Sequence, residues 1–437
     1  MPYVISIILT LAAFFWVNPV TAQEPPQDST TQSSTGAAAK SQLSLDDMRT
    51  FTDVFNQVRR NYVEEVDDKF LLDAAIQGML SDLDPHSAYL PNSEYEDLEQ
   101  SSKGQYVGIG VDVAAENGRV VVKAVITPSP ADSAGIDPGD IITSVDDVPV
   151  KGRPLREAID DLSGPPGSTV ELSITSPGGE KRTLVLERQV IKVPALSFRL
   201  LDQTIGYFRI VYFHHESAAD LQQSIESVLA DGIELEGVIL DLRNNPGGVL
   251  QPAIEIADGF LDEGEIVTTR GRNASMQMSF TAQQGQWLPG VPLVVLVDRG
   301  SASASEVLAG ALQDNGRAVI VGERTFGKGS VQSVLPLRNG SGLKLTTARY
   351  YTPSGRSIQA LGIDPDIPVA SAVQVVDYVD GRKLEADLDG HLDNELENAD
   401  QAAFSTVSIE EDYPLYEALN LLRATQIISG GKAASFR

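Results

Sequence analysis

The sequence predicts a multidomain α+β protein with a helical N-terminal segment, a compact β-rich module and an α/β core. Three observations indicate this fold class. Apolar residues recur at helical spacing between residues 43 and 101, short β-rich runs separated by turn signals fill residues 104–190, and buried strands alternate with helices across residues 191–370. A length of 437 residues is enough for about three domains, each with its own core.

The helical segment follows a polar stretch. Residues 23–42 are rich in Pro, Ser and Thr and show no periodicity, so they predict a disordered linker. In residues 43–101 an apolar stripe with i, i+3, i+4, i+7 spacing predicts an amphipathic helix. The stripe consists of Phe51, Val54, Phe55, Val58 and Tyr62. We expect a helical domain or arm that ends in turns at Pro85 and Pro91.

The β-rich module, residues 104–190, is predicted from its turns. Asn117-Gly118 lies between two β-rich runs and is a strong signal for a tight hairpin. A second turn is expected at Asp137-Pro138-Gly139, and apolar Leu155, Ile159 and Leu162 predict a short helix. Two further strands complete a compact module.

The α/β core is predicted from strands that read as continuously apolar. Residues 236–243 and 291–298 are such strands, and each is followed by a helical pattern. The tail, residues 371–437, is strongly acidic up to residue 412 and then predicts an amphipathic helix over residues 414–429.

The composition excludes several classes of function. The chain has no cysteine, so thiol catalysis, cysteine-ligated zinc and disulfide bonds are ruled out. Its formal net charge of −28 argues against a nucleic-acid partner, because phosphate binding needs clustered Lys and Arg. Otherwise an acidic surface indicates little more than solubility.

The N-terminus has the pattern of a secretory signal peptide, residues 1–22. Its apolar run is short for a membrane span, and Val20, Thr21 and Ala22 form a signal-peptidase-like site. We expect cleavage after Ala22 and export to the periplasm or another extracytoplasmic compartment. Since no Lys or Arg precedes the apolar run, an uncleaved membrane anchor is the alternative.

Two strand–helix junctions of the core are candidates for a site, because ligands gather where strands end and helices begin. The first is "DLRNNPGG", residues 241–248, in which Gly247 and Gly248 allow the backbone to approach a ligand closely. The second is "DRGSASASE", residues 298–306, which places serines at the start of a helix. The free N–H groups there favour a developing oxyanion.

The serines of the second junction have two readings. Ser301 or Ser303 could cap the helix and Ser305 could be an ordinary serine of its first turn, and the motif alone favours these roles. A nucleophilic serine would need a base, and none of the four histidines (His86, His214, His215 and His391) lies in a glycine-rich junction. Lys328, between Gly327 and Gly329, is a different candidate. A free lysine is a poor base at neutral pH, but burial can lower its pKa by about 3–5 units.

Taken together, the motifs resemble the C-terminal processing peptidases, or tail-specific proteases. They are "LDPHSAYL" (83–90), "DLRNNPGG", "SASASEVLAGALQDNGRAVIVGERTFGKGSVQ" and "TTARYYTPSGRSIQALGIDPDI" (346–367), in the family's order. The β-rich module, with "YVGIGVDV" and "SPADSAGIDPGDII", resembles the PDZ domain of that family. The resemblance covers residues 45–368 and implies a serine protease core of the crotonase or ClpP type.

The resemblance also implies the site. Ser303 would be the nucleophile, Lys328 its general base and Gln332 the residue that orients the lysine. The oxyanion hole would use the backbone N–H groups of Ala304 and Gly247, although Gly248 is an alternative to Gly247. In the PDZ domain, Gly108, Ile109 and Gly110 would receive a substrate C-terminus. Ser301, Ser305, His214 and His215 would then be structural or surface residues.

The expected function is that of a secreted serine endopeptidase with a Ser–Lys dyad, which needs no metal or organic cofactor. Its partners would be protein or peptide substrates with apolar C-termini, together with an activating adaptor or further copies of the chain, close to the membrane. One alternative is a PDZ-bearing scaffold or chaperone with an inactive core. Another is an acyl-transfer hydrolase that does not act on peptides. The function of the acidic tail stays open.

Overall fold

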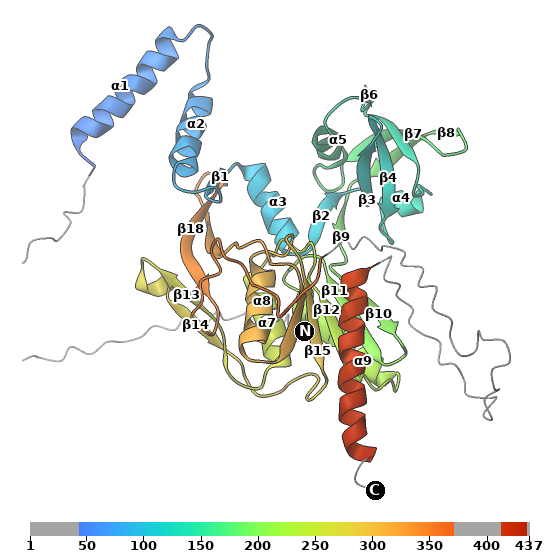
Figure 1. The fold of residues 1–437 in the computed structure, drawn as a ribbon. Helices are drawn as coiled ribbons and strands as arrows, with labels where there is room; N and C mark the ends of the chain where they lie inside the picture. The colour runs from blue at the N-terminus through green and yellow to red at the C-terminus, as the bar shows by residue number, and fades with distance from the viewer. Residues whose placement is uncertain (1–42, 371–411, 435–437) are drawn as a thin grey trace, which may run out of the picture. The chain divides into compact units, whose positions relative to one another are not determined.

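The computed structural model describes residues 43–370 and 412–434 (Figure 1). It divides into two compact units, residues 1–71 and residues 72–437. The predicted signal peptide, the linker and the acidic tail up to residue 411, including His391, lie outside the described residues. None of the helices in the described ranges is long and apolar enough to cross a membrane.

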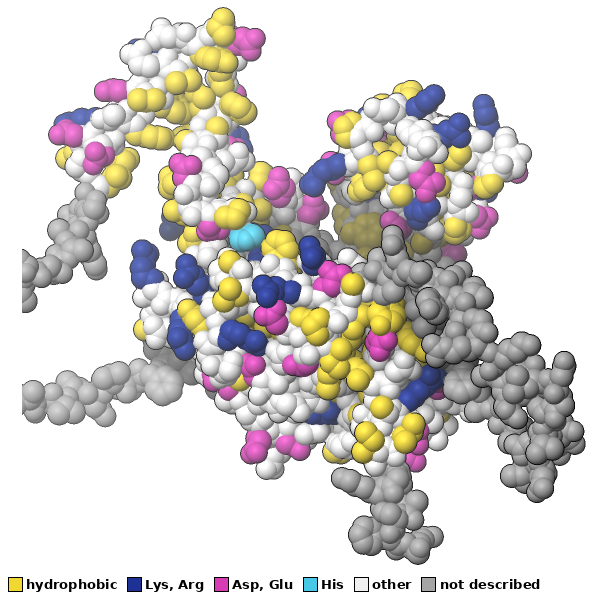
Figure 2. All heavy atoms as spheres, in the orientation of Figure 1, with side chains coloured by type: hydrophobic (Ala, Val, Ile, Leu, Met, Phe, Trp, Pro, Cys, Tyr) yellow, Lys and Arg dark blue, Asp and Glu magenta, His cyan; other side chains and the backbone are white. Residues whose placement is uncertain are grey.

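The first unit contains helix α1, Leu45–Asn61, which begins at a capping box. The Ser44 hydroxyl accepts the Asp47 N–H at 3.1 Å, and the Asp47 carboxylate accepts the Ser44 N–H at 3.1 Å. The predicted helix is therefore present, but none of its residues is buried. Its apolar stripe, including Phe51 and Val54, is open to solvent (Figure 2).

The predicted helical segment continues with helices α2, Asp68–Ser81, and α3, Asn92–Ser102. Between them lies a strand that we did not expect, β1, Ala88–Leu90. It pairs antiparallel with β18, Gly342–Tyr351, through partners such as Ala88 and Lys344. A partner more than 250 residues away decides the conformation here, which local pattern cannot reveal.

The β-rich module is a sheet of order β3-β4-β5-β7-β8, with β6 added to β5. Its strands are β3 Val111–Glu116, β4 Arg119–Val125, β5 Ile141–Val145, β6 Val148–Pro149, β7 Thr169–Thr175 and β8 Lys181–Glu187. Its helices are α4 Pro130–Ser133 and α5 Leu155–Leu162, and strands β2 Gln105–Gly108 and β9 Gln189–Lys192 pair at its ends. The hairpin at Asn117-Gly118 is confirmed, because both residues have the positive φ that a type I′ turn requires.

The α/β core is a sheet of order β10-β11-β12-β15-β16-β19, parallel except for β10. Its strands are β10 Leu196–Leu201, β11 Ile205–Ile210, β12 Gly237–Asp241, β15 Leu293–Val297, β16 Ala318–Gly322 and β19 Ile367–Pro368. Helices α6 Ser217–Ala230, α7 Leu250–Phe260 and α8 Ala304–Asp314 connect the strands. The predicted alternation of strands and helices is therefore confirmed.

The central strands β12 and β15 are buried at every residue because both faces of the sheet are covered. Leu240 and Val295 pack in the cluster that includes α6, α7 and α8, whereas Ile239 and Val294 face the opposite cluster. Helix α9, Tyr413–Ala434, supplies that second cluster with Leu415, Ala418, Leu419 and Leu422. The predicted C-terminal helix thus forms one wall of the core.

A second sheet of five strands has the order β1-β18-β13-β14, with β17 also paired to β18. It contains β13 Glu265–Gly271, β14 Met278–Thr281 and β17 Ser330–Pro336, with a short 3-10 turn, η1, at Ala274–Met276. The sequence analysis did not identify this sheet as a separate layer. It is important for the site because Lys328 lies in the loop just before β17 and Gln332 lies near the start of that strand.

Candidate active site

Ser303 lies in a sharp turn between β15 and α8. It has φ +57° and ψ −112°, a backbone conformation that non-glycine residues rarely adopt. Such a residue costs about 1–3 kcal/mol and persists only where its surroundings hold it in place. Ser303 is also buried. The predicted nucleophile is therefore a strained, buried serine directly before a helix.

The carboxylate of Glu306 holds this turn. Its Oε2 accepts the N–H groups of Ser303 at 2.7 Å and Lys328 at 2.8 Å. Its Oε1 accepts the Thr325 hydroxyl at 2.6 Å and the Gly327 N–H at 2.6 Å. One fully buried carboxylate therefore joins the backbone of the predicted nucleophile to that of the predicted base.

Glu306 was not among the residues predicted for the site, although the sequence carries a signal for it. A glutamate three residues after a serine at the start of a helix has the spacing of a capping box. Burial raises the pKa of Glu306, and its four hydrogen bonds oppose that rise. All four partners are donors, and this matches an ionised carboxylate.

Lys328 is half-buried in the loop between β16 and β17. Burial lowers its pKa, the positive charge of Lys344 lowers it further, and the negative charge of Glu306 acts in the opposite direction. Lys328 therefore has two of the causes that can make a lysine a competent base.

Gln332 lies on β17 within a polar cluster. Its Nε2 donates to Ser330 Oγ at 2.9 Å and to Thr346 Oγ1 at 3.3 Å. The Thr346 hydroxyl donates to Asp84 at 3.1 Å, and the Ser87 hydroxyl donates to the same carboxylate at 2.7 Å. The turn "LDPHSAYL" therefore contacts the strands that follow Lys328.

His86 belongs to the same turn and lies close enough to Lys328 for their charges to interact. Burial lowers the pKa of His86, the charges of Lys328 and Lys344 lower it further, and Asp84 opposes them. From sequence, His86 was expected in a turn and no role was predicted for it. Its proximity to the lysine depends on the pairing of β1 with β18.

The predicted oxyanion donors lie beside Ser303. Ala304 is the first residue of α8, and a Cβ added to Gly247 would stand 3.1 Å from its nitrogen and 2.9 Å from Ser303 Cβ. In this structure the Gly247 N–H donates to the Asn245 side chain at 2.9 Å. Gly248 has φ +136°, and a Cβ there would meet the Phe213 carbonyl at 2.1 Å. The structure thus brings Ser303, Ala304 and Gly247 together, while the choice of glycine stays a prediction.

The other serines of the motif have structural partners. The hydroxyl of Ser301 donates to the Leu242 carbonyl at 2.8 Å, and that of Ser305 donates to the Asn245 carbonyl at 2.9 Å. Both serines are fully buried and connect the two candidate junctions. The geometry agrees with the structural role expected for them.

The two adjacent histidines differ from each other. His214 is buried, its Nδ1 accepts the Glu216 N–H at 3.2 Å, and its ring packs against Gly104. Burial lowers the pKa of His214. His215 is exposed. Their contacts are with Ser102, Gly104 and neighbouring residues of α6, and none involves Ser303.

The predicted PDZ ligand loop is built around glycines. Gly110 has φ +89°, and a Cβ there would meet the Ser129 side chain at 2.2 Å. Ile109 is buried, and its carbonyl accepts the Ala131 N–H at 2.9 Å. The Tyr106 ring lies over Gly108, and burial raises the pKa of Tyr106 to about 12. The loop is therefore a tightly packed part of the module.

Comparisons with known proteins define the class. Residues 204–369 match peptidase family S41, residues 121–176 match a PDZ domain, and residues 7–94 match the N-terminal domain of the activating protease CtpB. The α/β core and these matches together define a serine-type peptidase that carries a PDZ domain.

Full-length relatives narrow the class to a family. The carboxy-terminal-processing protease of Bartonella bacilliformis is 42% identical over 383 residues, which cover 85% of this chain and 87% of that protein. The carboxy-terminal processing protease CtpB of Bacillus subtilis is 34% identical, with coverage of 76% and 68%. Among solved structures, the photosystem II D1 C-terminal processing protease is 32% identical, covers 73% of this chain and 92% of its own, and has a TM-score of 0.46. The chain belongs to the carboxy-terminal processing protease family, as its motifs indicated.

Proposed function

We propose that this peptidase is an endopeptidase with a Ser303–Lys328 dyad. The observation that carries the proposal is the Glu306 carboxylate, which accepts the backbone N–H groups of both residues. A shared anchor holds the backbones of the two residues at a fixed separation, and such positioning is a large part of catalysis. The depressed pKa of Lys328 supports its role as the base.

In the proposed reaction, neutral Lys328 takes the proton of Ser303 Oγ as this oxygen bonds to the substrate carbonyl carbon. The oxyanion receives the N–H of Ala304 and one from residues 247–248. When the carbon–nitrogen bond breaks, Lys328 gives its proton to the leaving amine. Water then loses a proton to Lys328, its oxygen bonds to the acyl carbon, and Ser303 Oγ leaves and regains the proton.

Gln332 is assigned the orienting role. Its amide nitrogen donates to Ser330 and Thr346, so its carbonyl oxygen Oε1 is the atom suited to accept from the Lys328 amine. The Gly247 N–H would have to exchange its bond with Asn245 before binding an oxyanion, unless Gly248 supplies the donor.

We also propose that the enzyme acts outside the cytoplasm on proteins with apolar C-terminal tails. The signal-peptide pattern of residues 1–22 supports export, with a membrane anchor as the alternative. The PDZ match, residues 121–176, supports recognition of tails, and we assign the strand addition to Gly108, Ile109 and Gly110 by resemblance to the family. The match to the N-terminal domain of CtpB supports an activating adaptor or self-association.

The dyad is tested with Ser303→Ala and Lys328→Ala in the full chain, and a tail-tagged protein serves as the substrate. Each substitution removes an essential group, so the rate of cleavage should fall by about 10⁴-fold or more while thermal unfolding changes little. Ser227→Ala is the control, because Ser227 is exposed on α6 and its hydroxyl donates to the Gln223 carbonyl of the same helix, so cleavage should stay at the wild-type rate. Residual cleavage in Ser303→Ala, or full loss in a His214/His215 double variant, would assign the chemistry elsewhere.

A further inference from the structure

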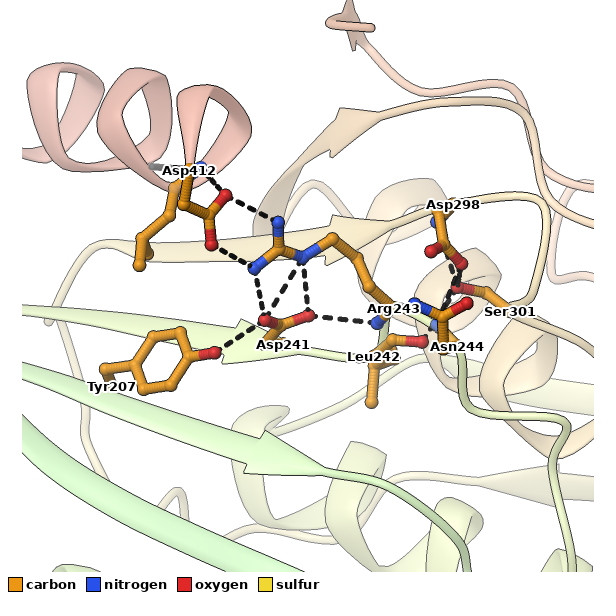
Figure 3. A network of polar contacts seen from close by, with 9 residues as sticks. Tyr207, Asp241, Leu242, Arg243, Asn244, Asp298, Ser301 and Asp412 are labelled. Atoms are coloured by element: carbon orange, nitrogen blue, oxygen red, sulfur yellow. Dashed lines mark hydrogen bonds and ion pairs between the residues drawn. The ribbon is translucent and has the colours of Figure 1, made fainter. Parts of the chain in front are cut away.

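Arg243 connects the C-terminal helix with the interior of the core. Its guanidinium bonds to Asp241, with 2.6 Å between Nη2 and Oδ2, and to both oxygens of Asp412 at 2.7 and 2.8 Å (Figure 3). Asp241 is fully buried and also accepts the Tyr207 hydroxyl at 2.6 Å. The arginine is thus held between a buried carboxylate of β12 and a carboxylate 169 residues later in the chain.

Asp412 stands directly before α9. Its Oδ1 accepts the N–H of Leu415 at 3.2 Å, as a helix N-cap does. Burial acts to raise the pKa of Asp412, but the hydrogen bonds and the charge of Arg243 outweigh it and lower the pKa, so the carboxylate is charged at neutral pH. Behind it, Leu415, Leu419 and Leu422 are buried against the sheet. The position of Asp412 is therefore fixed by the docking of the whole helix.

Arg243 also belongs to the segment that lies against the nucleophile. In this segment, residues 242–248, the Asn244 N–H donates to Asp298 at 2.8 Å, and the Asn245 carbonyl accepts the Ala302 N–H at 2.9 Å. Gly247 contacts Ser303 at the end of the same segment. The two glycines that are candidates for the oxyanion hole, Gly247 and Gly248, therefore follow Arg243 within five positions.

We propose that α9 positions the active site through the Arg243–Asp412 pair, and that both are positioning residues for segment 242–248. The inference rests on the proposed peptidase reaction. A bidentate, largely buried ion pair restrains the guanidinium in direction as well as distance. Loss of Asp412 would leave Arg243 held by Asp241 alone and would let the segment move relative to Ser303.

The chain offers a matched control on the same helix. Arg423 of α9 pairs with Asp202, in the turn between β10 and β11, and its Nε donates to Asp202 Oδ2 at 2.9 Å. This pair also holds α9, and within the described residues its hydrogen bonds do not involve segment 242–248. A variant at Arg423 therefore weakens the docking of the helix without altering Arg243.

The test compares Asp412→Asn with Arg423→Ala in the full chain. Asparagine is as good an N-cap as aspartate, so Asp412→Asn removes the charge pair and keeps the cap. We expect Asp412→Asn to lower kcat on a tail-tagged substrate by about tenfold with KM unchanged, and to speed amide hydrogen exchange in residues 242–248. Arg423→Ala should lower Tm but leave kcat and this exchange within about twofold of wild type.

Two results would overturn the proposal. The first is unchanged kcat and unchanged exchange in Asp412→Asn. The second is an equal loss of kcat in both variants, since this would reflect undocking of α9 in general. Failure of the wild-type chain to cleave the substrate would contradict only the proposed function. Amide hydrogen exchange needs no turnover, so it would still test the effect of the Arg243–Asp412 pair on residues 242–248.

Discussion

At the level of single residues, Glu306 decides whether Ser303 can keep its strained backbone. Its carboxylate is buried and receives four hydrogen bonds, two at each oxygen. A buried carboxylate with four donors restrains the positions of those donors far more strongly than an exposed glutamate would. The hydrogen bond from the Ser303 N–H to Glu306 therefore helps to maintain the strained backbone of Ser303.

Glu306→Gln should damage both activity and stability. The glutamine keeps the shape, but its NH₂ group replaces one oxygen and must face two donors. Two buried N–H or O–H groups would lose their acceptor at a cost of about 1–3 kcal/mol each. We expect a lower free energy of unfolding in urea and a kcat reduced by about 10²-fold. Glu255→Gln, at an exposed position of α7, is the control and should change neither quantity.

The second residue-scale prediction concerns pH. Only neutral Lys328 can act as the base, so kcat/KM should rise with pH through the pKa of this lysine and level off above it. Lys344 lowers that pKa, together with burial, while Glu306 opposes them. Lys344→Ala removes a like charge, stabilises protonated Lys328 and should move the acid limb of the profile to higher pH.

The pH profile of kcat/KM on a small peptide measures this shift. Lys181→Ala, at an exposed position of β8, is the control variant and should leave the limb in place. A limb that moves to lower pH in Lys344→Ala would show that a group other than Lys328 titrates.

At the level of elements, two helices with apolar stripes have opposite environments. None of the residues of α1 is buried, whereas α9 packs Leu415, Ala418 and Leu419 against the sheet. The sequence predicts both helices but not their environments, because periodicity reports a face that can be buried and not the partner that buries it. For α9 this partner is the core sheet, whose strands β12 and β15 are buried at every residue.

Leu419→Ala tests the contribution of α9 to the core. Leu419 is 0% exposed, so its truncation leaves a cavity and should lower the free energy of unfolding by about 2–5 kcal/mol. Ile427 on the same helix is 75% exposed, and Ile427→Ala should change the value by less than about 0.5 kcal/mol. Urea denaturation of both variants makes the comparison, and equal effects would mean that α9 is not docked in solution.

At the level of the whole molecule, the candidate site collects segments that are far apart in the chain. Thr346 bonds to Asp84 across 262 residues, and Arg243 bonds to Asp412 across 169. The connections depend on the second sheet, where β18 pairs with both β1 and β17, and on the docking of α9. Residues far from Ser303 and Lys328 in the sequence, such as Asp84 and Asp412, are therefore part of the surroundings of the site.

Local pattern determined much of this protein. The buried strands, the hairpin at Asn117-Gly118 and the helix that starts after Ser303 follow from apolar runs, turn chemistry and cap spacing, all of which act within a few residues. The family also followed from sequence, because four motifs in one order are specific even where each is weak. Ser303 and Lys328 were identified as candidates for that reason.

The tertiary structure alone decided what those residues contact. Glu306 became the joint anchor of Ser303 and Lys328 only when β16 placed residues 325–328 beside α8. Strand β1, the proximity of His86 to Lys328 and the Arg243–Asp412 pair likewise depend on partners far along the chain. Hydrogen bonds and ion pairs of this kind leave no periodic trace in sequence, since their spacing is set by the fold and not by the pitch of a helix or the alternation of a strand.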